Sequence, residues 1–464
     1  MFNKKYSACY VVAALMAAML IPVLFKGYSS IQRAEHDFAA QNYASAVQGY
    51  QQAARLLPWR DDLWEKAGIA AYANKNYSDA IPFLNRAPEL SEQGWAALGN
   101  SYVNTGDPVS ALQAYHGGLN DYDSPSLYAG LAFVYRQQKD WPAERDALQN
   151  QLRLDVSDAY SHYRLGLLLT FLAPEQALYE LTLASSLNPE TDSAVQTLTA
   201  ALNLSAAQPD ASQQMLTVGR ALGLVQEWEL SLAAFEKAIE LGGENAEAWA
   251  WLGEAKQQLG EDGSVELDRA LTLDHLSVIV RALRGLHWNR LGKYEQMRAE
   301  YALAAEYEPT NPAWQASLGD AYFKLGDLAA ALTAYQKATE LAPTDSIYWR
   351  LLANFCAENG VHIEDVGLPA AQHAVQLAPD DPFALDALGL SYLSSGRYAN
   401  AEQTFLNVIA SYPNHFPAYI HLAMTHLAQG NRPAAFSQLI HVRDADAGGD
   451  YAALANEMLK QYFP

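Results

Sequence analysis

A spaced pattern of small and aromatic residues recurs through most of this 464-residue chain and constrains its fold more than any other feature. The copy that begins at Asn311 reads NPAWQASLGDAYFKLGDLAAALTAYQKATELAPTD and contains Leu318, Gly319, Tyr322, Ala331, Tyr335, Ala338 and Pro343. The copy that begins at Asp381 repeats this spacing with Leu388, Gly389, Tyr392, Ala401, Phe405, Val408 and Pro413. Self-similarity with a period of about 20–50 residues indicates an array of stacked units rather than one globular core.

The pattern resembles the tetratricopeptide repeat, a helix–turn–helix unit of about 34 residues. Gly and Ala stand where two helices approach most closely, aromatic residues fill the space beside them, and Pro ends the second helix. The resemblance implies an all-α fold, a superhelical solenoid of about twelve units, because no unit buries its apolar face alone. The small residues of the first helices mark these units at Ala34, Gly68, Gly99, Gly130, Gly166, Gly219, Gly253, Gly285, Gly319, Ala353, Gly389 and Ala423.

The spacing of these markers is irregular in two places. Between Gly166 and Gly219 an additional segment predicts one extra helix, near residues 191–208, without a recognisable partner. Around residues 260–271 the second helix of a unit is shortened by about half a turn. We therefore predict a first block of repeats at 28–190, an irregular helix and junction at 191–211, a second block at 212–447 and a capping helix at 448–464.

The N-terminal segment has a different character. Residues 6–25 carry no charge and are bracketed by Lys4, Lys5 and Lys26. Twenty helical residues span about 30 Å, the thickness of the hydrocarbon core of a bilayer. Residues 1–27 are therefore predicted to form an uncleaved transmembrane signal-anchor, with the long acidic body outside the cytoplasm. The alternative is a cleaved signal peptide and a secreted body.

Charge and motifs exclude several classes of function. The 52 acidic residues outnumber the 30 basic ones and give a formal net charge of −22, which argues against nucleic acid as a partner. No glycine-rich phosphate loop, nucleophile elbow or HExxH motif is present, so we expect neither catalysis nor a cofactor. His421 and His426 are five residues apart and would lie on different faces of a helix, so no metal site is predicted.

The resemblance also suggests where a ligand would bind. Tetratricopeptide arrays commonly hold peptides or proteins in the groove of their first helices, and some grip a terminal carboxylate with Lys, Arg and Asn. The corresponding residues here are the polar or basic set of Arg290, Lys324, Arg350 and Asn354, with Asn289 and Phe323 beside them. The carboxylate clamp is incomplete, since Asp386 and Ala387 stand where more polar or basic groups are needed. An ordinary solvated face with hydrogen bonds between repeats is the alternative.

Together these features predict a membrane-anchored scaffold that binds protein or peptide partners in the groove of a solenoid. Similar anchored arrays serve in envelope assembly, secretion or surface-polysaccharide export, and the resemblance suggests such roles. The alternative is an accessory subunit that holds a membrane glycosyltransferase or polymerase in place. Catalysis by the chain itself would require a cluster of acids or histidines in the groove.

Overall fold

The computed structural model describes the backbone of residues 4–464 and the side chains of residues 18–464. Within residues 4–464 every regular element is a helix, and the prediction of an all-α repeat fold is confirmed. The α-helices are α1 Lys4–Ala39, α2 Tyr43–Leu56, α3 Asp62–Ala73, α4 Tyr77–Arg86, α5 Glu92–Thr105, α6 Pro108–Leu119, α7 Pro125–Gln137, α8 Trp141–Leu154, α9 Ala159–Leu172, α10 Pro174–Leu187, α11 Asp192–Ala206, α12 Ala211–Leu224, α13 Trp228–Leu241, α14 Ala246–Gln258, α15 Ser264–Leu273, α16 Val278–Arg290, α17 Tyr294–Tyr307, α18 Pro312–Lys324, α19 Leu328–Leu341, α20 Ser346–Asn359, α21 Leu368–Leu377, α22 Pro382–Ser394, α23 Tyr398–Ser411, α24 Phe416–Ala428, α25 Arg432–Ala445 and α26 Asp450–Tyr462. Two short irregular helices, η1 Pro189–Thr191 and η2 Ile363–Gly367, lie between them.

The small residues that mark each unit face large side chains of the following helix. A methyl group built on Gly319 would lie 2.8 Å from the Tyr335 ring, and one on Gly389 would lie 2.4 Å from Phe405. Tyr335 and Phe405 are themselves buried. The repeated pairing of a glycine with an aromatic ring about 16 residues later therefore sets the closest approach of the two helices in a unit.

The turns between the two helices of a repeat have a second recurring feature. Gly326 ends α18 with a φ of +81°, a conformation that glycine adopts without steric cost. Asp327 then caps α19, because its carboxylate accepts a hydrogen bond from the Ala330 amide at 2.9 Å. Helix end and helix start are thus encoded by adjacent residues.

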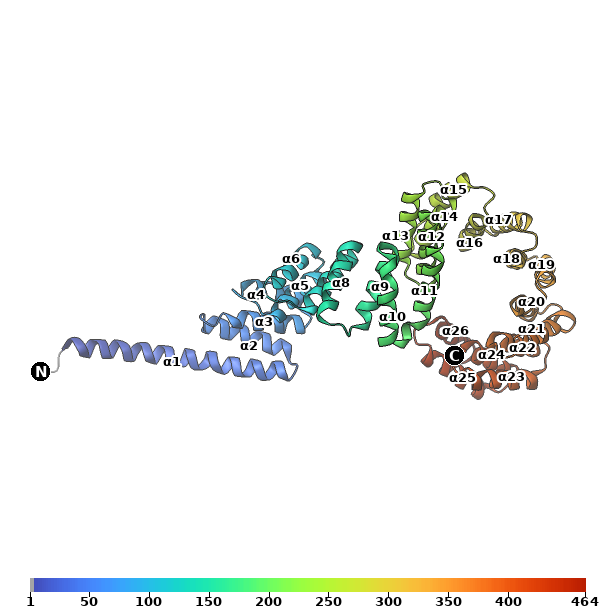
Figure 1. The fold of residues 1–464 in the computed structure, drawn as a ribbon. Helices are drawn as coiled ribbons and strands as arrows, with labels where there is room; N and C mark the ends of the chain where they lie inside the picture. Colours follow the sequence, from blue (N-terminus) through green and yellow to red (C-terminus); the bar gives the residue numbers. More distant parts are fainter. Residues whose placement is uncertain (1–3) are drawn as a thin grey trace. The chain divides into compact units, whose positions relative to one another are not determined.

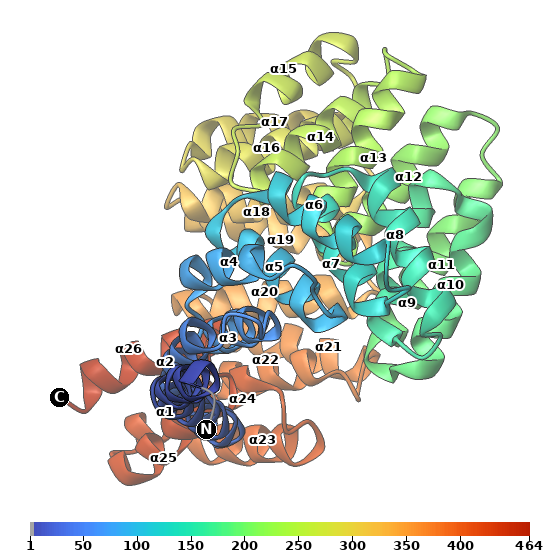
Figure 2. The same cartoon turned by 90° about the vertical axis from the view of Figure 1, so that its left-hand side faces the viewer.

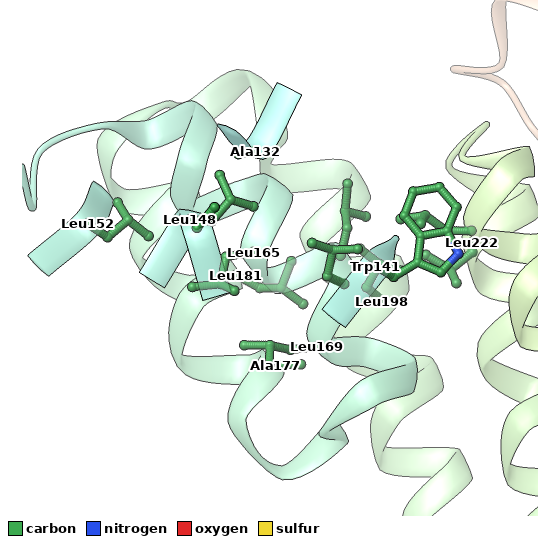
Figure 3. Close-up of a cluster of buried hydrophobic side chains, with 14 of the residues drawn as sticks. Ala132, Trp141, Leu148, Leu152, Leu165, Leu169, Ala177, Leu181, Leu198 and Leu222 are labelled. Carbon is green, nitrogen blue, oxygen red and sulfur yellow. The ribbon is translucent and has the colours of Figure 1, made fainter. Parts of the chain in front are cut away.

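The chain divides into two compact units, Met1–Ala234 and Phe235–Pro464. The largest core cluster of the first unit extends from α6 into α13, and Figure 3 shows part of it. In this cluster Leu198 of α11 lies with Leu222 of α12 and Trp141 of α8. The expectation that the extra helix lacks a partner is therefore wrong, since α11 packs against α10 and α12. The predicted block boundary at 191–211 stays a prediction.

The first unit begins with an unusually long helix. α1 is 36 residues long, and it lies beside α2 and continues past it toward the N-terminus (Figures 1 and 2). Ile31 and Ala34 of α1 are buried against α2, and Gly27 lies against Leu57. Much of the predicted anchor, residues 6–17, lies outside the residues whose side chains are described. Among the described residues, none of the helices combines the length and the apolar character that crossing a membrane requires.

The second unit is curved. Figure 1 shows α14, α16, α18, α20, α22 and α24 along the inside of the curve, with α15, α17, α19, α21, α23 and α25 outside. α26 packs on α25 and α24 at the end of the array. In this second unit the first helix of each repeat therefore lines a concave face. The side chains of these helices are those that a bound partner would contact.

Candidate functional site

The concave face of the second unit contains a cavity of about 420 Å³ formed by α16–α20. Its floor is aromatic: Tyr301, Tyr335 and Phe355 line it and are each about 95% buried. Phe323 lies at its edge, 36% exposed, with its ring centre 6.2 Å from that of Phe355. Such a combination of a buried aromatic floor and an accessible aromatic edge is typical of a site that holds one or two side chains of a partner.

Four of the six residues expected from the sequence line this cavity. Asn289 comes from α16, Phe323 and Lys324 come from α18, and Asn354 comes from α20. The Lys324 ammonium lies 5.9 Å from the centre of the Phe323 ring. Asn289 and Asn354 each offer both a hydrogen-bond donor and an acceptor, which suits the backbone of an extended peptide.

Arg290 does not line the cavity, because it is bound to a neighbouring repeat. Its guanidinium donates to Glu254 at 2.7 Å and to Gln257 at 3.0 Å, joining α16 to α14. The hydrogen bond to Glu254 raises the pKa of Arg290. The Glu254 side chain is only 5% exposed, so this pair has the inter-repeat role that was the alternative expectation for the patch.

Arg350 also lies outside the cavity. The centre of its guanidinium is 5.5 Å from the Phe383 ring of α22, an arrangement typical of a cation–π contact. The structure therefore brings Asn289, Phe323, Lys324 and Asn354 to one cavity and leaves the two arginines beside it.

Sequence reasoning missed the two acidic residues of the cavity, Asp320 of α18 and Glu358 of α20. Both side chains are exposed, but neighbouring atoms of the concave face partly desolvate their carboxyl groups. This desolvation raises the pKa of both carboxyl groups above their usual values. Asp320 accepts a hydrogen bond from the Tyr335 hydroxyl. Within residues 18–464 neither carboxylate forms an ion pair with a basic side chain.

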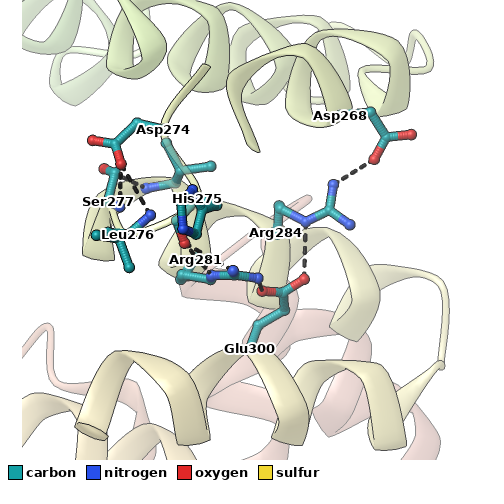
Figure 4. A network of polar contacts seen from close by, with 9 residues as sticks. Asp268, Asp274, His275, Leu276, Ser277, Arg281, Arg284 and Glu300 are labelled. Carbon is teal, nitrogen blue, oxygen red and sulfur yellow. Dashed lines mark hydrogen bonds and ion pairs between the residues drawn. The ribbon is translucent and has the colours of Figure 1, made fainter. Parts of the chain in front are cut away.

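Several acidic residues elsewhere in this unit have basic partners. Figure 4 shows Glu300 of α17 between Arg281 and Arg284 of α16, at 2.7 and 2.9 Å, and Arg284 reaches back to Asp268 of α15. On the concave face, Asp386 of α22 lies 3.0 Å from His421 of α24. The contacts of Arg284 with Asp268 and of Asp386 with His421 join successive repeats, whereas Glu300 is paired within its own repeat.

The arrangement is suited to recognition. In the described part of the chain no group of three or more His, Cys, Asp or Glu residues is placed to hold a metal ion. What the cavity does offer is an aromatic floor, amide groups and charge, which are the means by which proteins bind extended peptide segments.

Comparison with known proteins agrees with this architecture. Two family models, both described as tetratricopeptide repeat, match residues 31–94 and 387–450 in one case and 290–355 in the other. The chain is similar to Superkiller complex protein 3 of Mus musculus, with 24% identity over 353 residues, which is 73% of this chain and 22% of that protein. The human protein of the same name is 26% identical over 262 residues, 53% of this chain and 15% of that protein. The chain thus spans only about a fifth of the length of these relatives.

Two solved structures are similar to this chain in fold, at low sequence identity. Yeast Tom70 is 14% identical with a TM-score of 0.43, covering 94% of this chain and 95% of that one. A tetratricopeptide repeat protein from Parabacteroides merdae is 15% identical with a TM-score of 0.44, covering 54% of this chain and 97% of that one.

Proposed function

From the tetratricopeptide repeats that this chain contains, we propose that it is a scaffold that binds protein or peptide partners through the concave face of its second unit. The observation that carries the proposal is the cavity between α16 and α20, because four of the residues expected to contact a ligand line it. Accessible aromatic residues next to a well-packed floor are the residues that dominate binding energy in protein interfaces.

The proposal assigns roles to individual residues. Phe323 anchors an apolar side chain of the partner, since it is partly exposed and supported from behind by Phe355. Asn289 and Asn354 hydrogen-bond the partner's backbone from the two repeats on either side of the one that contains Phe323. Arg290 and Arg350 support the face from which the ligand is bound, through Glu254 and Phe383 respectively.

Replacement of Phe323 by alanine is expected to weaken peptide binding by about tenfold or more, because loss of an anchoring aromatic residue costs about 2 kcal/mol or more. The test is to select peptides from a random displayed library on the full-length protein. The affinity of each selected peptide is then measured by fluorescence anisotropy for the wild type and the variant.

Tyr398→Ala provides the matched control, because Tyr398 is exposed to a similar extent, 38%, but belongs to the outer helix α23. The control variant is expected to bind the selected peptides as the wild type does. The proposal is abandoned if the library yields no binding peptide, or if both variants lose affinity equally.

We also propose that residues 1–27 anchor the chain in a membrane, with the acidic body on the opposite side from Lys4 and Lys5. The support for this is the uncharged run of residues 6–25 with its basic flanks. Deletion of residues 1–27 is expected to move the chain from the membrane fraction to the supernatant after a carbonate wash, while its circular dichroism stays that of a strongly helical protein. A truncated chain that stays with the membranes would show that the anchor assignment is wrong.

A further inference from the structure

We infer that the cavity between α16 and α20 selects a basic segment of its partner, with a Lys or Arg side chain placed between Asp320 and Glu358. This inference rests on the proposed function and adds the charge class of the ligand. It reverses the preference for an acidic or carboxylate-ended ligand that the basic residues of the sequence suggested.

The first argument is geometric. Asp320 and Glu358 lie on neighbouring inner helices and line the same cavity. They also lie beside the same phenol: Tyr335 donates a hydrogen bond to Asp320, and the charge of Glu358 acts on its hydroxyl as well. One hydrogen bond from Tyr335 leaves Asp320 with further acceptor positions, and both carboxylates stay open to solvent on the side that a ligand would approach.

The second argument is the balance of charge. The cavity contains two carboxylates and one ammonium, that of Lys324. Lys324 is exposed and forms no ion pair within residues 18–464, although its charge acts on Asp320 and that of His421 acts on Glu358. On both sides along the concave face the acidic residues are already paired, Glu254 with Arg290 and Asp386 with His421. The middle of the face is therefore where negative charge lacks a partner.

The third argument is energetic. Burial raises the pKa of Asp320 and Glu358, so their charged forms are less stable in this cavity than in water. Unpaired charges that cost stability are characteristic of sites where a ligand supplies the missing partner. A lysine or arginine side chain fits for a further reason, because its aliphatic stem packs on Phe323 while its cation reaches the carboxylates.

The test compares two fluorescein-labelled ten-residue peptides, one alternating Lys and Ala and the other alternating Glu and Ala, on the full-length chain at physiological salt. We expect the lysine peptide to bind at least about tenfold more tightly than the glutamate peptide. The Asp320→Asn/Glu358→Gln variant should weaken the lysine peptide by about tenfold or more, while the acceptor for the Tyr335 hydroxyl is retained.

The control is Glu306→Gln/Glu457→Gln, which removes the same two charges from exposed positions on α17 and α26. It should change the affinity by less than about twofold, because exposed distant charges are screened by salt. If both double variants bind the lysine peptide equally more weakly than the wild type, the binding reflects a general attraction of the peptide to an acidic protein. That outcome would overturn the inference.

Two further outcomes separate this inference from the proposed function. If the glutamate peptide binds more tightly, or neither peptide binds, the basic preference is wrong. The scaffold proposal then stands or falls on the library-selected peptides and their dependence on Phe323.

Discussion

The Arg164→Met variant is expected to lose about 3–5 kcal/mol of unfolding free energy, because it removes one partner of a buried ion pair. The guanidinium of Arg164 in α9 donates to both carboxylate oxygens of Glu144 in α8, at 2.7 and 3.0 Å. The two side chains are only 4% and 2% exposed. Without the arginine, Glu144 becomes a buried charge with no counter-ion. The measurement is native-state hydrogen exchange of the α8 and α9 amides, which reports the local opening free energy of a repeat array.

A double variant distinguishes two contributions to the unfolding free energy: the cost of leaving the Glu144 carboxylate unpaired, and the net contribution of the ion pair. Arg164→Met/Glu144→Leu removes both charges and leaves side chains that pack against Trp141 and the surrounding leucines. It is expected to regain most of the loss, since buried pairs replaced together by apolar residues are often neutral in stability. If the double variant is as unstable as the single one, the loss comes from packing or from the contact of Arg164 with Glu227 at 3.4 Å, and not from the unpaired Glu144 carboxylate.

The Gly263→Ala variant is expected to destabilise the second unit by about 1–3 kcal/mol or more through overpacking. A methyl group at this position would lie 2.0 Å from the Gly253 carbonyl oxygen and 2.8 Å from the Gly253 Cα. These atoms belong to the backbone, so no side-chain rotation relieves the overlap. The φ of Gly263 is −94°, which alanine adopts freely, so the effect is purely steric. Urea unfolding of the full-length chain measures it.

Gly243→Ala is the matched control, because the nearest atom to its added methyl group is the Ile239 carbonyl oxygen at an ordinary 3.7 Å. Its effect is expected to stay within about 0.5 kcal/mol of the wild type. An unchanged unfolding midpoint for Gly263→Ala would mean that α14 and α15 approach less closely than described.

The all-helical repeat fold could be predicted because its determinants are local. Gly319 and Tyr335 belong to one unit, and the same spacing recurs at Gly389 and Phe405, so sequence periodicity reports their contact directly. The packing of α11 was harder to predict from the sequence, since Leu198 belongs to the same core cluster as Trp141 of α8, which is far from it in the sequence. A helix without a repeat partner in the sequence can still have one in space.

The candidate site was likewise only partly predictable from the sequence: local positions could be predicted, but contacts between repeats could not. In the three repeats of the cavity the residue after the small marker lines it, as Leu286 follows Gly285, Asp320 follows Gly319 and Asn354 follows Ala353. This offset could have identified Asp320. The same offset does not predict which charged residues form ion pairs with one another. Arg290 meets Glu254 36 positions away, a contact that depends on how one repeat is rotated against the next. A search for basic residues also favoured Arg290 over the acids of the cavity.

The length of α1 has a mechanical consequence. The helix runs without a break from Lys4 into the segment whose Ile31 and Ala34 are packed in the first repeat. Pro22 removes one backbone hydrogen bond within this helix and is its one built-in weak point. Between Pro22 and the packed segment the helix is uninterrupted, so torsion or tension applied there reaches the first repeat directly. Successive residues of a helix are rotated by about 100° around its axis, so one residue inserted near Lys26 would rotate the first repeat by about 100° relative to the N-terminal end of α1.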